Sequence, residues 1–271
     1  MTRVLSAGVL IALVVGTVWL APVWATIALA AVAAALAAGE LAGLAGAADA
    51  PLPPVFLGAA AAVVCVAFAS RSLLAPGGGP DLLEVVVLAG LVAAGTMSLA
   101  APGPPRPATL TRAGLAVMGP LYVGLPLGAI ASIRVLDGPG AVFWLLLVVA
   151  VSDSAQYYVG RLLGRRKLAP IVSPAKTVEG AIGGLVAATI AGAVAAPRLA
   201  GPSLTVPAGA LVALLVASFG IAGDLFESLL KRSAAVKDSS SLIPGHGGVL
   251  DRVDSYLFAA PCYYVVLRYL A

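Results

Sequence analysis

The stretch "LVALLVASFGIAGDLFESLLKR", from Leu211 to Arg232, passes from apolar to charged within what we predict to be one helix. Asp224, Ser228 and Lys231 are spaced four and three residues apart, so they share one face of that helix. A carboxylate after a long apolar run costs about 2.5–3.5 kcal/mol at the centre of a membrane helix, and less near the interface. We therefore expect Asp224 to meet a positive partner, either a lysine or a metal ion.

Apolar runs of this kind recur along the whole chain. The 271 residues are 61% hydrophobic and 10% charged, whereas a soluble domain carries about 25% charged residues. A helix rising about 1.5 Å per residue needs about 20 residues to cross a hydrocarbon layer of about 30 Å. We predict an all-α, polytopic integral membrane protein with about nine transmembrane helices, at 4–20, 23–45, 53–70, 82–100, 112–133, 140–160, 177–196, 204–227 and 252–270.

The distribution of basic residues predicts the orientation. With nine spans, the side that holds the N-terminus carries twelve of the sixteen basic residues, and positively charged loops stay in the cytoplasm. We therefore predict a multi-pass protein of the inner (plasma) membrane with a cytoplasmic N-terminus. The apolar run after Arg3 is longer than the core of about 7–15 residues that a cleaved signal peptide has. We therefore expect it to be a membrane span rather than a signal peptide. The twelve residues are Arg3, Arg106, Arg112, Arg161, Arg165, Arg166, Lys167, Lys176, Lys231, Arg232, Lys237 and Arg252.

The net charge of +4 fits this bias together with a phosphate site. A nucleic-acid partner is not expected, because no separate soluble domain carries a basic patch. The two cysteines, Cys65 and Cys262, both lie within predicted spans. We therefore predict neither a disulfide nor a cysteine metal site.

Ionisable groups gather in the second half of the chain, on the predicted cytoplasmic side. We predict that residues 1–135 are packing helices with dimer contacts, and that residues 136–271 form the catalytic region. In the first half, Glu40 is either a functional acid inside the membrane or a helix-end carboxylate near its surface. The polar segments of the second half are 152–167, 173–180, 223–232 and 231–254.

The segment "KRSAAVKDSSSLIPGHGGVLDRVD", Lys231 to Asp254, holds the only histidine of the chain. Asp251 and Asp254 lie three residues apart at the start of a predicted helix, where "DRVD" is either a helix cap with a flanking salt bridge or part of a site. Clustered aspartates suit Mg²⁺, and the nearby lysines and arginines suit phosphate oxygens. The glycines of "GHGG" at 245–248 let the backbone approach a ligand closely. Together they indicate a metal-dependent polyphosphate site.

Two other kinds of site are disfavoured. The sequence has no GxxxxGK[ST] loop, which argues against a P-loop ATPase. A single histidine argues against a zinc site built from histidines.

The segment "SLLKRSAAVKDSSSLIPGHGGVLDRVD", Ser228 to Asp254, resembles throughout the signature of phosphatidate cytidylyltransferases, also called CDP-diacylglycerol synthases. That signature reads S-x-x-K-R, K-D, P-x-H-G-G and D-R-x-D. The upstream "SDSAQYYVGRLLGRRKLAPIVSPAKTVEG", Ser152 to Gly180, is similar to a second family block. Its Tyr157–Tyr158 pair departs from the single aromatic expected there and puts local packing in doubt. The earlier spans match only by hydropathy, and none of their residues is placed in the site.

The resemblance implies transfer of a cytidylyl group from CTP to phosphatidate, giving CDP-diacylglycerol and pyrophosphate. It implies Mg²⁺ as cofactor, and it suggests a second, monovalent cation such as K⁺, which the residues alone do not distinguish from a single-metal site. It also implies a homodimer. Because CTP is soluble and phosphatidate is a lipid, we expect a polar cavity at the cytoplasmic leaflet that opens to water and to lipid.

The resemblance also suggests roles for individual residues. Asp224 and Asp251 would bind Mg²⁺, with Asp254 and Ser228 completing or bracing that site. His246 would orient the nucleotide or its loop, or act on a proton. The expected catalytic residues are Asp224, Asp251, Lys231, Asp254 and His246; the expected substrate-binding residues are Ser173, Lys176, Thr177, Glu179, Ser228, Arg232, Lys237, Asp238, Gly247, Gly248, Arg252 and Asp153.

Some of these residues have simpler interpretations. "SPAKTVEG" would be an ordinary helix start, with Ser173 capping, Pro174 in the first turn, and Thr177 and Glu179 solvated. Asp153 would be a solvated acid at a helix end. For the whole chain, the rival functions are a polyprenol kinase, an ether-lipid cytidylyltransferase, and a cation-coupled transporter.

Overall fold

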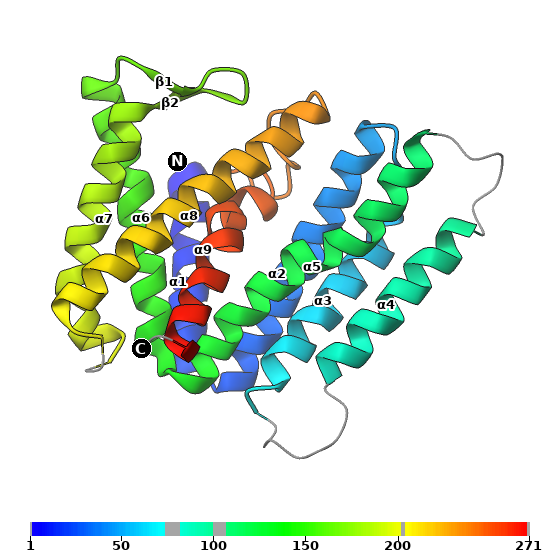
Figure 1. Ribbon diagram of the computed structural model, residues 1–271, viewed down its shortest axis with the longest axis horizontal. Coiled ribbons are helices and arrows are strands. Elements are labelled where there is room, and N and C mark those ends of the chain that lie inside the picture. Colours follow the sequence, from blue (N-terminus) through cyan, green and yellow to red (C-terminus); the bar gives the residue numbers. More distant parts are fainter. Residues whose placement is uncertain (1, 74–81, 100–106, 202–203, 270–271) are drawn as a thin grey trace. The chain divides into compact units, whose positions relative to one another are not determined.

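The computed structural model describes residues 2–73, 82–99, 107–201 and 204–269. Two residues of the orientation argument, Arg106 and the side chain of Arg3, lie outside this description. The described residues form nine α-helices and one β-hairpin (Figure 1). Their bounds are α1 Thr2–Leu20, α2 Val23–Ala47, α3 Pro54–Ser70, α4 Leu82–Leu99, α5 Pro107–Leu136, α6 Gly138–Leu163, β1 Lys167–Ala169, β2 Ser173–Thr177, α7 Val178–Leu199, α8 Val206–Ser233 and α9 Leu250–Tyr269.

Each predicted span overlaps one of these helices, and a predominantly helical fold with several long apolar helices is that of an α-helical membrane protein. The helix that carries Asp224 ends at Ser233 rather than at 227. The predicted span covered only the apolar part, and the charged residues after it continue the same helix. Five helices are long and apolar enough to cross a membrane, namely α2, α5, α6, α7 and α8. The antiparallel hairpin of β1 and β2, which pairs Lys167 with Thr177, is an addition to the predicted fold.

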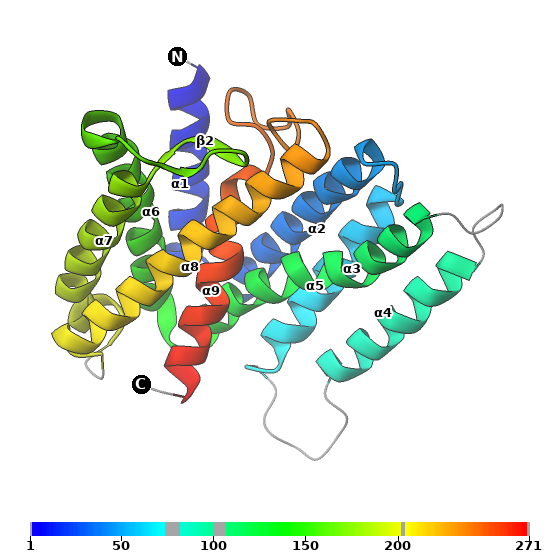
Figure 2. The same cartoon turned by 45° about the horizontal axis from the view of Figure 1, so that its top comes forward.

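The chain divides into two compact units. The first unit comprises Met1–Val135 and Ser233–Arg252, and the second comprises Leu136–Arg232 and Val253–Ala271. The segment that joins α8 to α9 is an irregular loop and belongs to the first unit, although both helices are mostly in the second (Figure 2).

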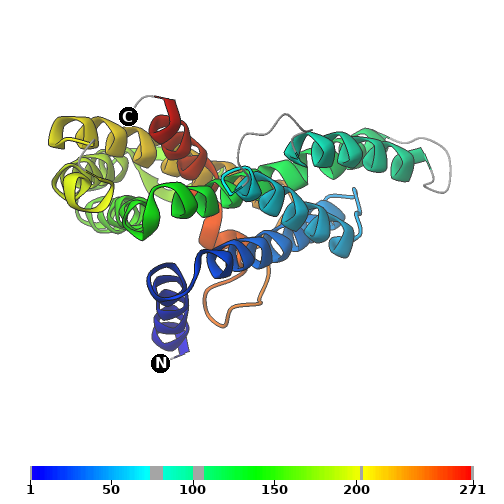
Figure 3. The ribbon, with the colours of Figure 1, turned by 90° about the horizontal axis from the view of Figure 1, so that it is seen from below.

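Small residues bring helices of the first unit close together. A Cβ on Gly58 of α3 would lie 2.7 Å from the carbonyl oxygen of Ala35 in α2. A Cβ on Gly124 of α5 would lie 2.5 Å from the carbonyl oxygen of Ala61 in α3. Backbones approach this closely in membrane proteins where glycine and alanine face each other. As a result, α2, α3, α4 and α5 run side by side in this unit (Figure 3).

The second unit has an aromatic core between α6, α7 and α9. The indole N–H of Trp144 in α6 donates to the carbonyl oxygen of Gly192 in α7, at 2.9 Å. The ring of Tyr263 in α9 lies 4.7 Å from that of Trp144. Arg268 and Asp137 form an ion pair at the far ends of α9 and α6. These contacts hold the helices whose other ends carry the polar residues.

Candidate functional site

An ion pair joins the hairpin of the second unit to α8. Lys176 of β2 donates to the Oδ2 atom of Asp224. The hydroxyl of Ser228, one turn further along α8, lies 3.5 Å from the Oδ1 atom of Asp224, a weak hydrogen bond. Of the two partners left open for Asp224 by the sequence, the structure therefore shows the lysine.

A close approach of α8 and α9 brings Asp254 to the same place. A Cβ on Gly223 would lie 2.6 Å from the carbonyl oxygen of Asp254, so only glycine fits there. The charges of Asp224, Glu227 and Asp153 all act on the carboxylate of Asp254. Four acidic side chains thus gather at the polar end of this unit, and Lys176 offsets part of their mutual repulsion.

Substitution of Gly223 tests this packing. Alanine is favoured over glycine by up to about 1 kcal/mol in a helix, but overpacking costs about 1–3 kcal/mol. We therefore expect Gly223→Ala to lower the thermal unfolding temperature of the detergent-solubilised protein. The control is Gly220→Ala one turn earlier, where a Cβ would meet nothing closer than 3.8 Å and stability should hold or rise. Equal unfolding temperatures for the two variants would contradict the close approach.

A second ion pair in α8 was missed by the sequence analysis. Glu227 is 0% exposed, and its carboxylate pairs with Lys231 one turn along the helix. A buried carboxylate needs such a partner, since charge is costly away from water. Glu227 follows Asp224 by three residues, so the spacing that placed Ser228 and Lys231 on one face also placed Glu227 there. That spacing was the signal available in the sequence.

The "SPAKT" segment is a strand, so the simpler interpretation of it as a helix start at Ser173 is wrong. The helix cap is Thr177, whose buried hydroxyl accepts the N–H of Gly180 at 3.1 Å. Glu179 is not merely solvated either, because it accepts the backbone N–H groups of Arg165 and Arg166. Those bonds hold the turn between α6 and the hairpin.

The remaining predicted residues of the second unit lie at its polar end. Asp153 is exposed on α6 and accepts from Gln156 at 3.2 Å. The guanidinium of Arg232, at the end of α8, donates to the carbonyl oxygen of Val172 at 3.3 Å. Arg232 therefore holds the turn between β1 and β2, in the hairpin that carries Lys176.

The rest of the predicted residues belong to the first unit, in the segment Ser233–Arg252, which comprises the loop between α8 and α9 and the first residues of α9. Asp251 is their centre: its Oδ2 atom accepts the N–H and hydroxyl of Ser239, at 2.9 and 2.7 Å, and the N–H of Gly248, at 2.8 Å. Gly247 has a φ of +78°, and a Cβ there would lie 2.6 Å from the same oxygen. Glycine is thus required for the loop to wrap around this carboxylate.

The other loop residues are more peripheral. The Nδ1 atom of His246 lies 2.9 Å from the hydroxyl of Ser6 in α1. Three charged side chains of this segment are exposed, namely Lys237, Asp238 and Arg252. Asp251 lies in the first turn of α9 and accepts N–H groups of the preceding loop, from Ser239 and Gly248. The capping interpretation of "DRVD" therefore stays a prediction.

Glu40 of α2 contacts the same loop, which the sequence analysis did not foresee. It lies seven residues before the end of α2, so it is not a helix-end carboxylate. Its two oxygens accept hydrogen bonds from Ser239, Ser240, Val249 and Leu250. The partners are separated from it by 199 to 210 residues in the sequence, so no local spacing could have revealed the contact.

A model of the cytidylyltransferase family matches residues 1–270. The chain belongs to this family. Proteins named phosphatidate cytidylyltransferase are among its relatives. The one in Bacillus subtilis is 40% identical over 163 residues, which are 59% of this chain and 60% of the relative. The one in Helicobacter pylori is 42% identical over 156 residues, 57% of each chain, and the one in Synechocystis is 48% identical over 118 residues, 43% of this chain and 40% of the relative.

Membership of the cytidylyltransferase family confirms the resemblance found in the sequence. Each of these three matches spans less than two thirds of the relative's own length. The family match, in contrast, includes the first five helices, which resembled the family only by hydropathy.

The polar end of the second unit has the donor chemistry of a magnesium site. Asp224, Asp254 and Ser228 offer only oxygen atoms, which a hard cation prefers. No three histidine, cysteine, aspartate or glutamate side chains converge as a ready-made metal site in the part of the chain that the structure describes. Mg²⁺ does not require such a group, because it commonly binds one or two carboxylates together with water and substrate phosphates. The residues therefore fit a cation that arrives with a nucleotide.

Proposed function

We propose that this protein is a phosphatidate cytidylyltransferase, which converts CTP and phosphatidate into CDP-diacylglycerol and pyrophosphate in phospholipid biosynthesis. The observation that carries the proposal is the 40% identity over 163 residues to the Bacillus subtilis protein of that name. The arrangement of lysines and carboxylates at the polar end of the second unit supports it, because the reaction joins two polyanions.

The basic residues of the second unit are suited to holding those polyanions. A phosphatidate oxygen attacks the α-phosphorus of CTP in line, the bond to the β-phosphate oxygen breaks, and pyrophosphate leaves. Lys176, Lys231 and Arg232 lie on β2 and at the end of α8, and their charges would bind phosphate oxygens. Asp224 holds Lys176 through its ion pair and thereby orients one of these cations.

Carboxylates of α8 and α9 would hold the metal. We assign Asp224, Asp251 and Asp254, with Ser228, to Mg²⁺. Bound there, Mg²⁺ would supply charge neutralisation to the phosphates and the leaving group. Asp251 precedes Asp254 by three residues on α9, which places the two on one face of that helix. A monovalent cation such as K⁺ is part of the same proposal.

The other predicted residues keep roles in substrate binding in this proposal. Residues of the hairpin side would contact CTP or the phosphatidate head group, and residues of the loop would contact the nucleotide. His246 is assigned to orienting that loop, since its ring meets the hydroxyl of Ser6. The residues of the hairpin side are Ser173, Thr177, Glu179 and Asp153. The residues of the loop group are Lys237, Asp238, Gly247, Gly248 and Arg252.

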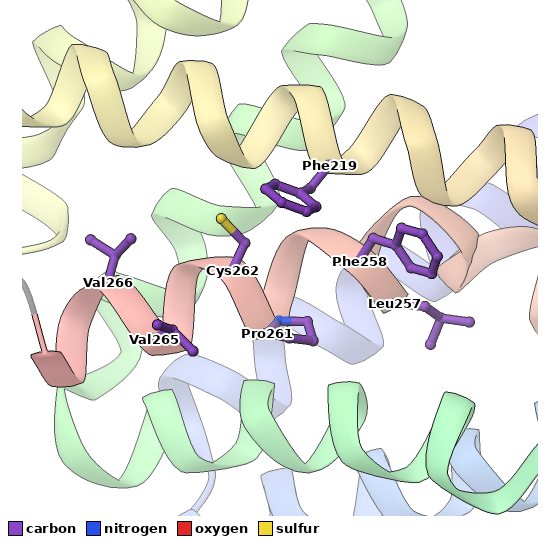
Figure 4. A pocket seen from close by; sticks show the side chains of 7 residues that line it. All are labelled: Phe219, Leu257, Phe258, Pro261, Cys262, Val265 and Val266. Atoms are coloured by element: carbon purple, nitrogen blue, oxygen red, sulfur yellow. The ribbon is translucent and has the colours of Figure 1, made fainter. Parts of the chain in front are cut away.

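An apolar pocket in the second unit suits an acyl chain of phosphatidate. It has a volume of about 440 Å³ and lies between α8 and α9. Phe219, Phe258 and Cys262 point into the space between the two helices (Figure 4). Phe258 follows Asp254 by one helical turn, so the pocket continues directly from the acidic residues. Leu257, Pro261, Val265 and Val266 complete the lining.

The membrane arrangement of the enzyme is part of the proposal. We infer about nine spans, a cytoplasmic N-terminus, a site facing the cytoplasm at the inner (plasma) membrane, and a homodimer. The side of the membrane that is predicted to carry most of the basic residues includes Lys176 and Arg232. This supports the orientation, because CTP is a cytoplasmic nucleotide.

The test is an assay of the full chain in detergent with labelled CTP, phosphatidate and Mg²⁺. We expect labelled lipid and pyrophosphate in equal amounts, and we expect EDTA to abolish both, because two polyanions need a divalent cation to approach each other. Restoration by excess Mg²⁺ is the control. Release of CDP with a phosphorylated polyprenol would favour the kinase, and transfer to an archaeal ether lipid alone would favour the ether-lipid enzyme. Absence of any reaction in all lipid mixtures would favour the transporter.

A further inference from the structure

Glu40 makes four hydrogen bonds, all to the loop and helix start that carry Asp251. Its Oε1 atom accepts the hydroxyl of Ser240 at 2.8 Å and the N–H of Val249 at 2.9 Å. Its Oε2 atom accepts the hydroxyl of Ser239 at 2.9 Å and the N–H of Leu250 at 2.8 Å. Each oxygen therefore faces one hydroxyl and one backbone amide, and the single hydroxyl proton of Ser239 is shared with the Oδ2 atom of Asp251.

The two amides belong to the start of α9. The first N–H groups of a helix have no partner within the helix and carry partial positive charge. Val249 and Leu250 supply two of these groups, and the negative charge of Glu40 satisfies both. Glu40 thus acts as a cap for α9 although it comes from α2.

Ser239 connects Glu40 to Asp251. Its hydroxyl lies 2.9 Å from the Oε2 atom of Glu40 and 2.7 Å from the Oδ2 atom of Asp251. Gly248 fills the remaining space: a Cβ there would lie 2.2 Å from the Ser239 hydroxyl and 2.3 Å from the Glu40 oxygen. The N–H of Gly248 also donates to Asp251. Ser239 and Gly248, which both donate to Asp251, are therefore bonded to Glu40 or packed against it.

We propose that Glu40 is a positioning residue, which fixes the Asp251 carboxylate for cation binding by clamping residues 239–250 to α2. This inference rests on the proposed function, in which Asp251 binds Mg²⁺. Partners that hold a metal ligand in place affect metal affinity or activity by about 10–100-fold when they are removed. Glu40 itself need not touch CTP or phosphatidate.

The decisive variant is Glu40→Gln. Glutamine keeps the shape, but its amide nitrogen replaces one oxygen and must face a hydroxyl and a backbone N–H. A hydroxyl can rotate and accept, whereas a backbone N–H cannot, so one amide at the start of α9 loses its partner. We expect the Mg²⁺ concentration that gives half-maximal cytidylyl transfer to rise about 10–100-fold. The matched control is Glu84→Gln in α4, an exposed glutamate of the same unit, which should change nothing.

Two measurements separate positioning from general stability. A loss of stability alone would lower the amount of active enzyme without moving the half-saturating Mg²⁺ concentration. Hydrogen exchange of the peptide containing residues 239–251 should also become faster in Glu40→Gln, while peptides from α6 and α7 stay unchanged. Glu40→Asp, which keeps both oxygens but is one methylene shorter, should restore part of the Mg²⁺ affinity.

Unchanged Mg²⁺ dependence in Glu40→Gln would overturn the proposal, whether or not exchange becomes faster. A readout without catalysis keeps this result distinct from failure of the proposed function. We expect Mg²⁺ with CTP to raise the unfolding temperature of the wild-type protein, with a midpoint that shifts to higher Mg²⁺ in Glu40→Gln. If the wild type transfers no cytidylyl group, the proposed function fails; a shifted midpoint would then still support the role of Glu40, and an unshifted one would overturn it.

Discussion

Asp224→Asn is expected to lower the rate of cytidylyl transfer on the order of 10³-fold in a protein that remains folded. Asparagine has nearly the same shape as aspartate but no charge, so it loses the ion pair with Lys176 and the attraction for a cation. Metal-ion charge stabilisation is worth several kcal/mol in the transition state, and each 1.4 kcal/mol is about tenfold in rate. The measurement is kcat/KM for CTP at saturating phosphatidate and Mg²⁺, with the unfolding temperature recorded on the same sample.

The control for this variant is Asp49→Asn. Asp49 is exposed after the end of α2, and its φ of +59° is a conformation that asparagine adopts readily. We expect its activity to match the wild type. Activity within about tenfold of wild type in Asp224→Asn would remove Asp224 from the metal site, because so small a loss corresponds to only about 1.4 kcal/mol.

Lys231→Met is expected to lower the free energy of unfolding by about 3–5 kcal/mol, because it leaves the carboxylate of Glu227 buried without its cation. Glu227 is 0% exposed, and Asp254 lies near enough for its charge to add repulsion. The measurement is unfolding by denaturant in detergent micelles. This experiment measures stability only. Its result is therefore separate from any loss of activity that follows when a phosphate-binding lysine is removed.

A double variant makes this prediction sharper. Glu227→Leu combined with Lys231→Met removes both charges, and we expect it to recover most of the stability lost in the single variant. Lys237→Met changes an exposed lysine of the same stretch and should stay within about 0.5 kcal/mol of wild type. A double variant no more stable than Lys231→Met would show that the pair is not what stabilises α8.

The helices could be predicted from the sequence because each contains a long, predominantly apolar run, and hydropathy is a local property. The hairpin could not, since β1 is three residues long and its pairing with β2 depends on contacts across a turn. Thr177 is predicted to bind substrate, and the structure shows in addition that its hydroxyl caps α7, a role that the sequence did not single out.

Parts of the candidate site were accessible from spacing, and others were not. The long apolar run before Asp224 predicted that this carboxylate needs a positive partner, and Lys176 supplies it. The choice of Lys176 required the hairpin to fold back onto α8, which no periodicity in the sequence describes. The same is true of Glu40, whose partners lie at the other end of the chain and whose own helix looks like a simple apolar span.

The division of the chain into units has a consequence for making the protein in two pieces. A cut between residues 135 and 136 would leave Ser233–Arg252 on the second fragment, although that segment belongs to the first unit. The first fragment would then present the Glu40 carboxylate with none of its four donors. Complementation between such fragments would require the second to donate its loop to the first, so neither fragment alone would contain a finished folding unit.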